Sequence, residues 1–190
     1  MKNLLYLTSN PYKFREAQIV LADEYGFNLE IMNPDFELYE IQAATCAEVA
    51  AFTARYGADK LGKACLKSDT GLYIEGFGNL PGPYNAYFDK QLGPEKFIEL
   101  FKNEPNRKAR IEHCFAYCAP GEEPKVFVGG STGTIATECR PGDGRWHDFF
   151  FIPDGETRTL SEIGVQDGPE AKLSFYGHAI RDFAEWFKEQ

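Results

Sequence analysis

The stretch LLYLTSNPYK, residues 4–13, sets the class of the fold. Its apolar run followed by a polar turn predicts a buried strand over residues 4–8 that ends in a loop. Pro11 suits the first turn of a helix, and apolar residues spaced three or four apart continue that helix to about Tyr25. A strand that leads directly into a helix is typical of α/β proteins, so we expect a fold of that class.

The rest of the chain alternates between strand and helix patterns. The expected strands are 28–32, 64–68, 71–75, 109–118, and a hairpin of 125–128 and 132–137 around Gly129 and Gly130. The expected helices follow capping boxes at Thr45–Glu48 and Thr159–Glu162, open at Pro94, and end the chain around Phe183 and Phe187. The hairpin-rich middle predicts a mixed sheet, so the expected fold class is α/β (mixed).

Composition and charge narrow the class of partner. The 190 residues suit one domain, 1–190, or one domain built as two lobes around a cleft. The formal net charge of −9 argues against nucleic-acid duplexes and anionic membranes, since both require a basic face. The apolar run at residues 4–7 is too short for a signal peptide or a membrane span. The five cysteines are irregularly spaced, so we expect reduced thiols in a cytoplasmic protein.

The turn after the first strand has the chemistry of an anion site. A strand that enters a helix presents backbone N–H groups and the positive end of the helix dipole. Thr8, Ser9 and Asn10 add side-chain donors, and Lys13 adds a positive charge, so a phosphate chain would fit here. The turn has no Walker pattern and is not a P-loop. The alternative is that Asn10 only caps the helix and Lys13 is a solvated lysine of its first turn.

Glu40 and Asp69 are the acids that would complete such a site. Glu40 lies in a polar stretch after the second strand, and Asp69 lies in the tight turn expected between two strands. Two carboxylates near a phosphate chain can hold Mg²⁺, and one of them can activate the attacking water. In the alternative interpretation, Asp69 bonds its own turn backbone and Glu40 is a surface acid.

Six motifs, taken together, resemble the inosine triphosphate pyrophosphatase family. In chain order they are TSNPYK at 8–13, SDTGL at 68–72, LPGPY at 80–84, the Phe-x-Gly-x-x-x-Gly-x-Ile pattern at 127–135, FIPDG at 151–155, and a lysine at position 172. They follow the order of the family's motifs and span nearly the whole chain.

The resemblance implies a fold and a reaction. The fold is an elongated mixed β-sheet flanked by helices, in two lobes around a central nucleotide cleft, and such proteins are usually homodimers. The reaction is Mg²⁺-dependent hydrolysis of non-standard purine nucleoside triphosphates (ITP, dITP, XTP) to the monophosphate and pyrophosphate. By the same resemblance Thr8, Asn10 and Lys13 hold the triphosphate, Glu40 binds the metal, and Asp69 binds metal or activates water. Gly71 would let the chain turn after Asp69.

Three segments depart from the family's pattern. Ser68 stands where the family commonly has a second acid, so one metal carboxylate is missing. Asp148 matches the family, but Arg145 replaces a base-stacking Phe, so either Arg145 or Trp146 would stack on the base. These first two departures affect the metal and the base, respectively.

The third departure is near the C-terminus. Lys172 would reach the purine, but His178 replaces an arginine that reads it, and Arg181 one turn further on is the alternative reader. The candidate substrate residues are therefore Thr8, Ser9, Asn10, Lys13, Trp146, Asp148, Lys172 and His178. Two further hypotheses stay open: the same reaction on a different or modified base, and a nucleotide-binding module without turnover.

Overall fold

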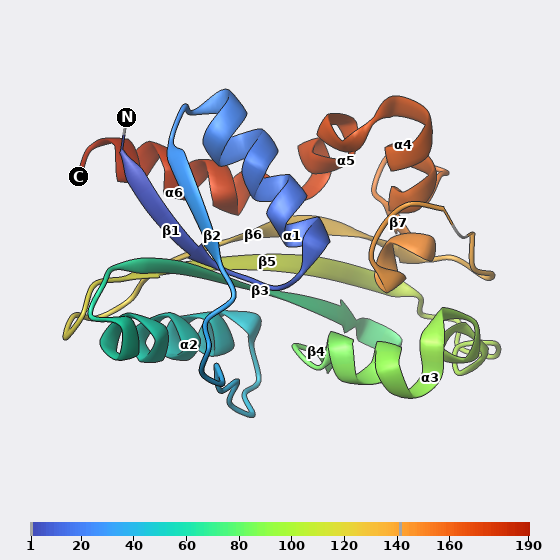
Figure 1. Cartoon of the computed structure of the whole chain (residues 1–190). Helices are drawn as coiled ribbons and strands as arrows, with labels where there is room; N and C mark the ends of the chain where they lie inside the picture. The colour runs from blue at the N-terminus through green and yellow to red at the C-terminus, as the bar shows by residue number, and fades with distance from the viewer. Residues whose placement is uncertain (1, 141) are drawn as a thin grey trace. The chain divides into compact units, whose positions relative to one another are not determined.

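A mixed seven-stranded sheet carries the fold in the computed structural model, which describes residues 2–140 and 142–190 (Figure 1). The strands are β1 (Asn3–Leu7), β2 (Asn28–Met32), β3 (Cys65–Ile74), β4 (Leu80–Gly82), β5 (Lys108–Cys118), β6 (Lys125–Ile135) and β7 (Phe151–Pro153). Their hydrogen-bonded order is β2-β1-β3-β5-β6-β7, with β4 paired to β3 off this path. β1 is parallel to β2 and β3, whereas β3–β4 and β6–β7 are antiparallel, so the predicted mixed sheet is confirmed.

The helices follow the expected order, with three additions. They are α1 (Pro11–Ala17), its π-helical continuation η1 (Gln18–Glu24), α2 (Cys46–Leu61), η2 (Glu75–Phe77), α3 (Asn85–Glu99), η3 (Trp146–Phe149), α4 (Leu160–Asp167), α5 (Pro169–Tyr176) and α6 (His178–Lys188). Both predicted capping boxes are confirmed, at the starts of α2 and α4. The three additions are η2, η3 and α5. Among the strands, the sequence patterns did not predict β4 or β7. Among the described residues, no helix is both long and apolar enough to cross a membrane.

The described residues divide into two compact units. The first comprises residues up to Asp69, His113–Gly129 and Gly177–Gln190, and the second comprises Thr70–Glu112 and Gly130–Tyr176. β3, β5 and β6 each contribute residues to both units. The expectation of one domain over 1–190 stays a prediction, as does the nucleotide cleft.

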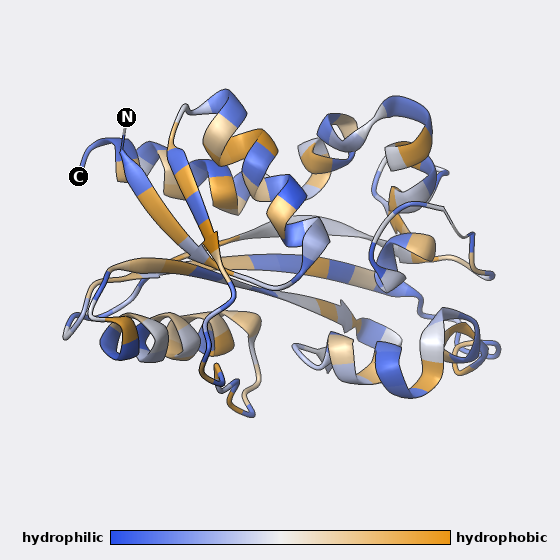
Figure 2. Ribbon diagram, viewed as in Figure 1, coloured by the Kyte–Doolittle hydropathy of each residue, from blue (hydrophilic) through white to orange (hydrophobic). Residues whose placement is uncertain are grey.

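In the first unit, helices cover both faces of the strands (Figure 1). On one face, the small residues Ala50, Ala54 and Ala58 of α2 pack in a core with Leu5, Leu7, Cys114 and Ala116. Residues of a strand alternate between faces, so Tyr117 points the other way, where its ring contacts those of Phe183 and Trp186 on α6. Figure 2 shows the apolar character of β1, whose residues 4–7 are all buried.

The second unit has an aromatic core. The Phe97 ring lies 4.6 Å from that of Trp146, 5.1 Å from that of Phe101 and 5.5 Å from that of Phe150. These rings come from α3, from the residues just after it, and from η3 with the residue that follows it. Burial of such large rings is the main source of stability that the sequence offers to this unit.

β3 runs without a break through Asp69, so the predicted turn between two strands is wrong. Gly71 is not at a positive φ. A Cβ atom at Gly71 would collide with the ring of Tyr73. Gly71 therefore serves close packing within a strand, and it does not turn the chain.

The predicted hairpin around Gly129 and Gly130 is wrong for a similar reason, because β6 is one continuous strand. A Cβ atom at Gly129 would collide with the backbone of Ala179 on α6, and one at Gly130 with the carbonyl of Ile111. These glycines admit neighbouring backbone and do not mark a turn.

The predicted start of α3 is also wrong, because the helix begins at Asn85 and Pro94 lies inside it. Gly93 has a φ of 70°, which interrupts the helix just before Pro94. A proline suits the first turn of a helix, so Pro94 opens the second, shorter part. The local signal at Pro94 marked this kink.

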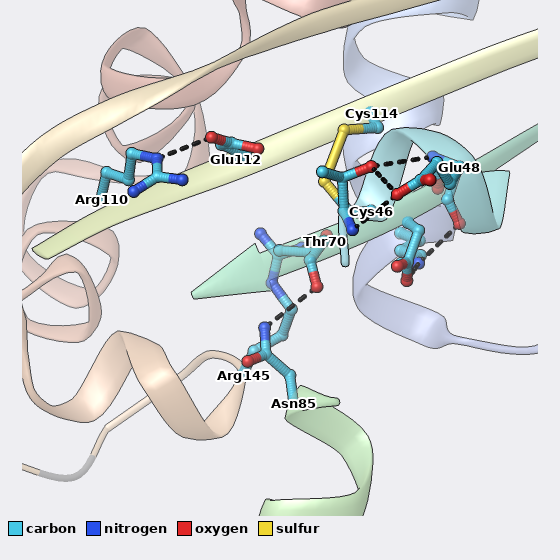
Figure 3. The surroundings of a disulfide bond; sticks show 12 residues. Cys46, Glu48, Thr70, Asn85, Arg110, Glu112, Cys114 and Arg145 are labelled. Atoms are coloured by element: carbon cyan, nitrogen blue, oxygen red, sulfur yellow. Dashed lines mark hydrogen bonds and ion pairs between the residues drawn. A yellow bond between two sulfur atoms is a disulfide. The ribbon is translucent and has the colours of Figure 1, made fainter. Parts of the chain in front are cut away.

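The expectation of five reduced thiols is wrong for two of them, since Cys46 and Cys114 form a disulfide (Figure 3). Cys46 is the first residue of α2 and Cys114 lies on β5, with Cα atoms 6.0 Å apart. The free cysteines are Cys65, Cys118 and Cys139. Burial raises the pKa of the Cys65 thiol to about 12, with a smaller contribution from Cys118, so Cys65 is unreactive at neutral pH.

Reduction of this disulfide should destabilise the protein. Closing a loop between residues 68 apart removes chain entropy from the unfolded state, so we expect the oxidised protein to be about 2–4 kcal/mol more stable. Urea unfolding with and without reductant measures the difference. Cys46→Ala should abolish the response to reductant and Cys139→Ser should keep it. Identical midpoints for the oxidised and reduced parent protein would contradict the prediction.

Candidate active site

The candidate site lies where β1 and β2 end. The two strands run parallel, with Leu7 opposite Met32, and the Thr8 N–H donates to the Met32 carbonyl at 3.1 Å. Their carboxyl ends therefore meet at one edge, and the loops 8–10 and 33–40 leave the sheet together. Ligands of open α/β sheets commonly bind at such an edge.

A cavity of about 270 Å³ lies at this edge. Its lining residues are Thr8, Ser9, Asn33, Pro34, Phe36, Glu37, Leu38, Glu40 and Lys67. Pockets for whole drug-sized ligands usually measure roughly 300–1,000 Å³. The cavity is therefore suited to one part of a nucleotide, such as its phosphate groups. Of the predicted residues, Thr8, Ser9 and Glu40 are brought together here.

Asn10 caps the helix, as the alternative interpretation held. Its Oδ1 accepts hydrogen bonds from the backbone N–H groups of Tyr12 (2.9 Å) and Lys13 (3.3 Å). The Asn10 N–H donates to Thr8 Oγ1 at 3.1 Å. Most backbone donors that the sequence offered to an anion are thus used within the turn. The Asn10 Nδ2 donates to no described residue, so the amide keeps a donating end.

Lys13 is not the solvated lysine of the alternative interpretation. Its Nζ donates to the Ser68 carbonyl at 2.8 Å and lies 3.9 Å from Asp69 Oδ1. The side chains of Lys13 and Asp69 are only 17% and 14% exposed. The structure therefore brings the two predicted catalytic residues together, although they are 56 positions apart in the sequence.

Ser68 has a structural partner. Its hydroxyl forms a 2.5 Å hydrogen bond with the Tyr6 hydroxyl, and both residues are buried. Because side chains alternate along a strand, the Ser68 side chain points to the face opposite that of Asp69. The Tyr6–Ser68 hydrogen bond links β1 to β3 two residues before Thr8.

Lys67 is the residue of this site that sequence reasoning missed. It lies two residues before Asp69, so both side chains project from the same face of β3. Burial lowers the pKa of the Lys67 ammonium. Glu40 and Asp69 raise it, but their effect is smaller than that of burial. Both carboxylates are thus within electrostatic reach of one ammonium group. The only sequence signal was a lysine inside an apolar strand next to a candidate catalytic acid.

The same residues fit a hard divalent cation. Glu40 offers a carboxylate and Thr8 and Ser9 offer hydroxyl oxygens in the cavity, and Asp69 acts on the same Lys67 ammonium as Glu40. Oxygen donors of this kind suit Mg²⁺, which keeps several of its waters when bound.

The second unit holds a buried ion pair among the predicted base-recognition residues. Lys172 Nζ donates to Asp148 Oδ2 at 3.0 Å, and Asp148 is completely buried. Burial alone raises the pKa of Asp148, but Lys172, His147 and Arg145 together hold that pKa below its ordinary value. Lys172 therefore stabilises Asp148 in this structure.

Arg145 joins this pair to neighbouring residues. Its N–H donates to Asp148 Oδ2 at 2.9 Å, and its guanidinium lies 5.3 Å from the centre of the Tyr176 ring. It also donates to the Thr70 hydroxyl at 3.5 Å, beside a 3.0 Å bond from Asn85 Nδ2 to the Thr70 carbonyl (Figure 3). An arginine in this segment thus packs against an aromatic ring of its own unit.

The other predicted base contacts have different surroundings. Trp146 is 6% exposed and packs in the aromatic core against Phe97. His178 is exposed as the first residue of α6. Arg181 donates two hydrogen bonds to Glu24, at 2.8 and 3.0 Å. Base recognition by Trp146, Asp148, Lys172 and His178 stays a prediction.

Comparison with known proteins identifies the family. Residues 4–186 match the Ham1 family. The chain is 40% identical over 185 residues to a dITP/XTP pyrophosphatase of Methanopyrus kandleri, covering 97% of this chain and 96% of that protein. It is 35% identical over 186 residues to a dITP/XTP pyrophosphatase of Thermococcus kodakarensis, covering 98% and 97%. A HAM1 protein structure from Coxiella burnetii aligns over 100% of both chains with a TM-score of 0.82 at 23% identity. The protein belongs to the Ham1 family, as its motifs indicated.

Removal of Lys172 should destabilise the second unit in a pH-dependent way. Lys172→Met leaves Asp148 buried without its principal partner, which costs roughly 3–5 kcal/mol at pH 7. The exposed Lys96→Met is the matched control. Chemical unfolding at several pH values measures the loss.

The sign of the pH effect follows from Asp148. In the parent protein its pKa is lowered, so its contribution is present above about pH 4 and is lost as the pH falls. In Lys172→Met we expect that pKa to rise above its unfolded value, so the deficit should grow from pH 4 to pH 7. A deficit that stays constant over this range would refute the role of the pair.

Proposed function

We propose that this protein is a nucleoside triphosphate pyrophosphatase. It hydrolyses non-standard purine nucleoside triphosphates (ITP, dITP and XTP) to the monophosphate and pyrophosphate. Membership of the Ham1 family and near full-length similarity to proteins named dITP/XTP pyrophosphatase support this activity. The observation that carries it is the cavity at the ends of β1 and β2, lined by Thr8, Ser9 and Glu40, in the unit that also holds the Lys13–Asp69 pair.

The charges around the cavity favour a metal ion as part of the substrate complex. Glu37 and Glu40 line the cavity together with Lys67, so a metal ion would offset the negative charge that the two acids place near a triphosphate. We therefore include Mg²⁺ in the proposal, held by Glu40 and Asp69 with its remaining waters. Bound Mg²⁺ supplies Lewis-acid stabilisation of charge on the phosphoryl oxygens.

The chain's own residues bind the phosphate groups and activate the attacking water. Thr8, Ser9 and the Asn10 amide donate hydrogen bonds to phosphate oxygens. Asp69 accepts a proton from the attacking water, or orients it, because its carboxylate is held in place by Lys13 at 3.9 Å. Lys13 adds positive charge next to that carboxylate.

We propose a cytoplasmic homodimer in which residues 1–190 act as one catalytic domain. The dimer is suggested by the resemblance of the motifs to the inosine triphosphate pyrophosphatase family. The cytoplasm is where a nucleotide pool would need such clearance.

A panel of triphosphates tests the activity. With Mg²⁺, we expect pyrophosphate release from ITP, dITP and XTP to exceed that from ATP and GTP by at least about tenfold in kcat/KM, in keeping with a site that pairs buried polar groups with the base. Omission of the metal with a chelator should abolish turnover. Faster release from another base would favour a retuned base site, and binding without any release would favour a binding module.

Asp69→Asn tests the assigned base. Loss of the carboxylate should lower kcat by about 10²–10⁴-fold, the usual contribution of a general base, while the fold is kept. Asp35→Asn changes an exposed acid of the neighbouring loop and is the matched control. Turnover by Asp69→Asn at the rate of the control would remove Asp69 from the mechanism.

A further inference from the structure

The turn after β1 has few backbone groups left for an anion. The N–H groups of Thr8, Asn10, Tyr12 and Lys13 all donate within the turn or to β2. Pro11 has no N–H to offer. Positive charge for a phosphate chain must therefore come from side chains.

Lys13 is only partly available for that purpose. Its ammonium already donates to the Ser68 carbonyl at 2.8 Å and lies 3.9 Å from Asp69. An ammonium group has three donors, so Lys13 can still contact a ligand. However, part of its charge is balanced by Asp69, and it is not among the residues that line the cavity.

Lys67 is placed where a phosphate cation is needed. Among the described residues that line the cavity, it is the one with a positive charge. Within residues 2–140 and 142–190, its Nζ forms no hydrogen bond within 3.5 Å and no ion pair within 4.0 Å, so its donors are available to a ligand. A lysine whose donors have no protein acceptor can give its hydrogen bonds to a bound anion.

Neutralisation of the nearby acids is the simpler explanation for Lys67. Glu40 and Asp69 both act on its ammonium, so Lys67 could serve only to offset their charge. In that case a divalent cation would make Lys67 redundant, and its removal would strengthen metal binding without weakening anion binding. The two roles therefore predict different behaviour towards an anion in the absence of metal.

We propose that Lys67 is a phosphate-binding residue whose ammonium contacts the oligophosphate group of the ligand in the cavity at the ends of β1 and β2. The inference rests on the proposed function, because it assigns the phosphate end of the substrate to this cavity. It adds a binding residue that lies outside the sequence motifs.

The test uses inorganic pyrophosphate as the probe, in metal-free buffer with a chelator. Isothermal titration calorimetry compares the parent protein with Lys67→Met and with Lys63→Met, an exposed lysine just before β3. Loss of a hydrogen bond between charged groups should weaken binding by tenfold or more in Lys67→Met. Lys63→Met should bind within twofold of the parent.

Two further variants keep the result interpretable. Lys67→Gln retains length and polarity, so it should fold if Lys67→Met does not, and it should show the same loss of affinity. Lys67→Arg retains the charge and should recover at least part of it. Titration with Mn²⁺ should show tighter metal binding in Lys67→Met, because a competing positive charge is gone.

The outcomes separate this inference from the proposed function. Parent-like pyrophosphate affinity in folded Lys67→Met and Lys67→Gln would overturn the role of Lys67, even if the parent enzyme hydrolyses its triphosphates normally. No pyrophosphate binding by the parent protein would overturn it as well. Failure of the parent to hydrolyse any triphosphate, with pyrophosphate binding and its Lys67 dependence intact, would instead overturn only the proposed function.

Discussion

The parallel pairing of β1 with β2 and β3 is the constraint on which the candidate site depends. It brings the carboxyl ends of β1 and β2 to one edge, where the loops that carry Thr8 and Glu40 enclose a cavity of about 270 Å³. The hydrogen bond between Tyr6 and Ser68 locks β1 to β3, and this sets the position of Lys67 and Asp69 on the next strand. A register shift of one residue in β3 would move both side chains to the opposite face.

Opposite charges lie close together near the carboxyl ends of β1 and β2, as in the Lys13–Asp69 pair at 3.9 Å. Lys13 is tied to β3 through the Ser68 carbonyl, and it approaches Asp69 in surroundings that exclude most water. Lys67 projects from the same face of β3 as Asp69, and both Glu40 and Asp69 act electrostatically on its ammonium group. The second unit differs, because Lys172 and Asp148 neutralise each other in a fully buried pair.

Local sequence signals predicted those parts of the fold that local physics decides. Periodicity and capping located β1, the helix that follows it, and the starts of α2 and α4. The turns predicted at Gly71 and Gly129 were wrong. Both glycines lie inside continuous strands, where they allow close packing of neighbouring atoms. The pairing of Cys46 with Cys114 could not be deduced from spacing among five cysteines.

The candidate site was predictable to a similar extent. The polar turn and the acids Glu40 and Asp69 carry clear chemical signals. The structure places Thr8, Ser9 and Glu40 around one cavity, and Asp69 acts electrostatically on Lys67, which also lines it. Lys67 carries no such signal, because its role depends on strand register and on a loop that is distant in the sequence. The candidate base contacts were harder still, since Trp146 is a core residue whose surroundings only tertiary packing reveals.

The products of ITP hydrolysis test the central claim most directly. Phosphorus NMR of a reaction with Mg²⁺ distinguishes cleavage at the two anhydride bonds. The account predicts inosine monophosphate and pyrophosphate as the only initial products. Inosine diphosphate and inorganic phosphate would contradict it, because they would show that the cavity directs water to the terminal phosphate.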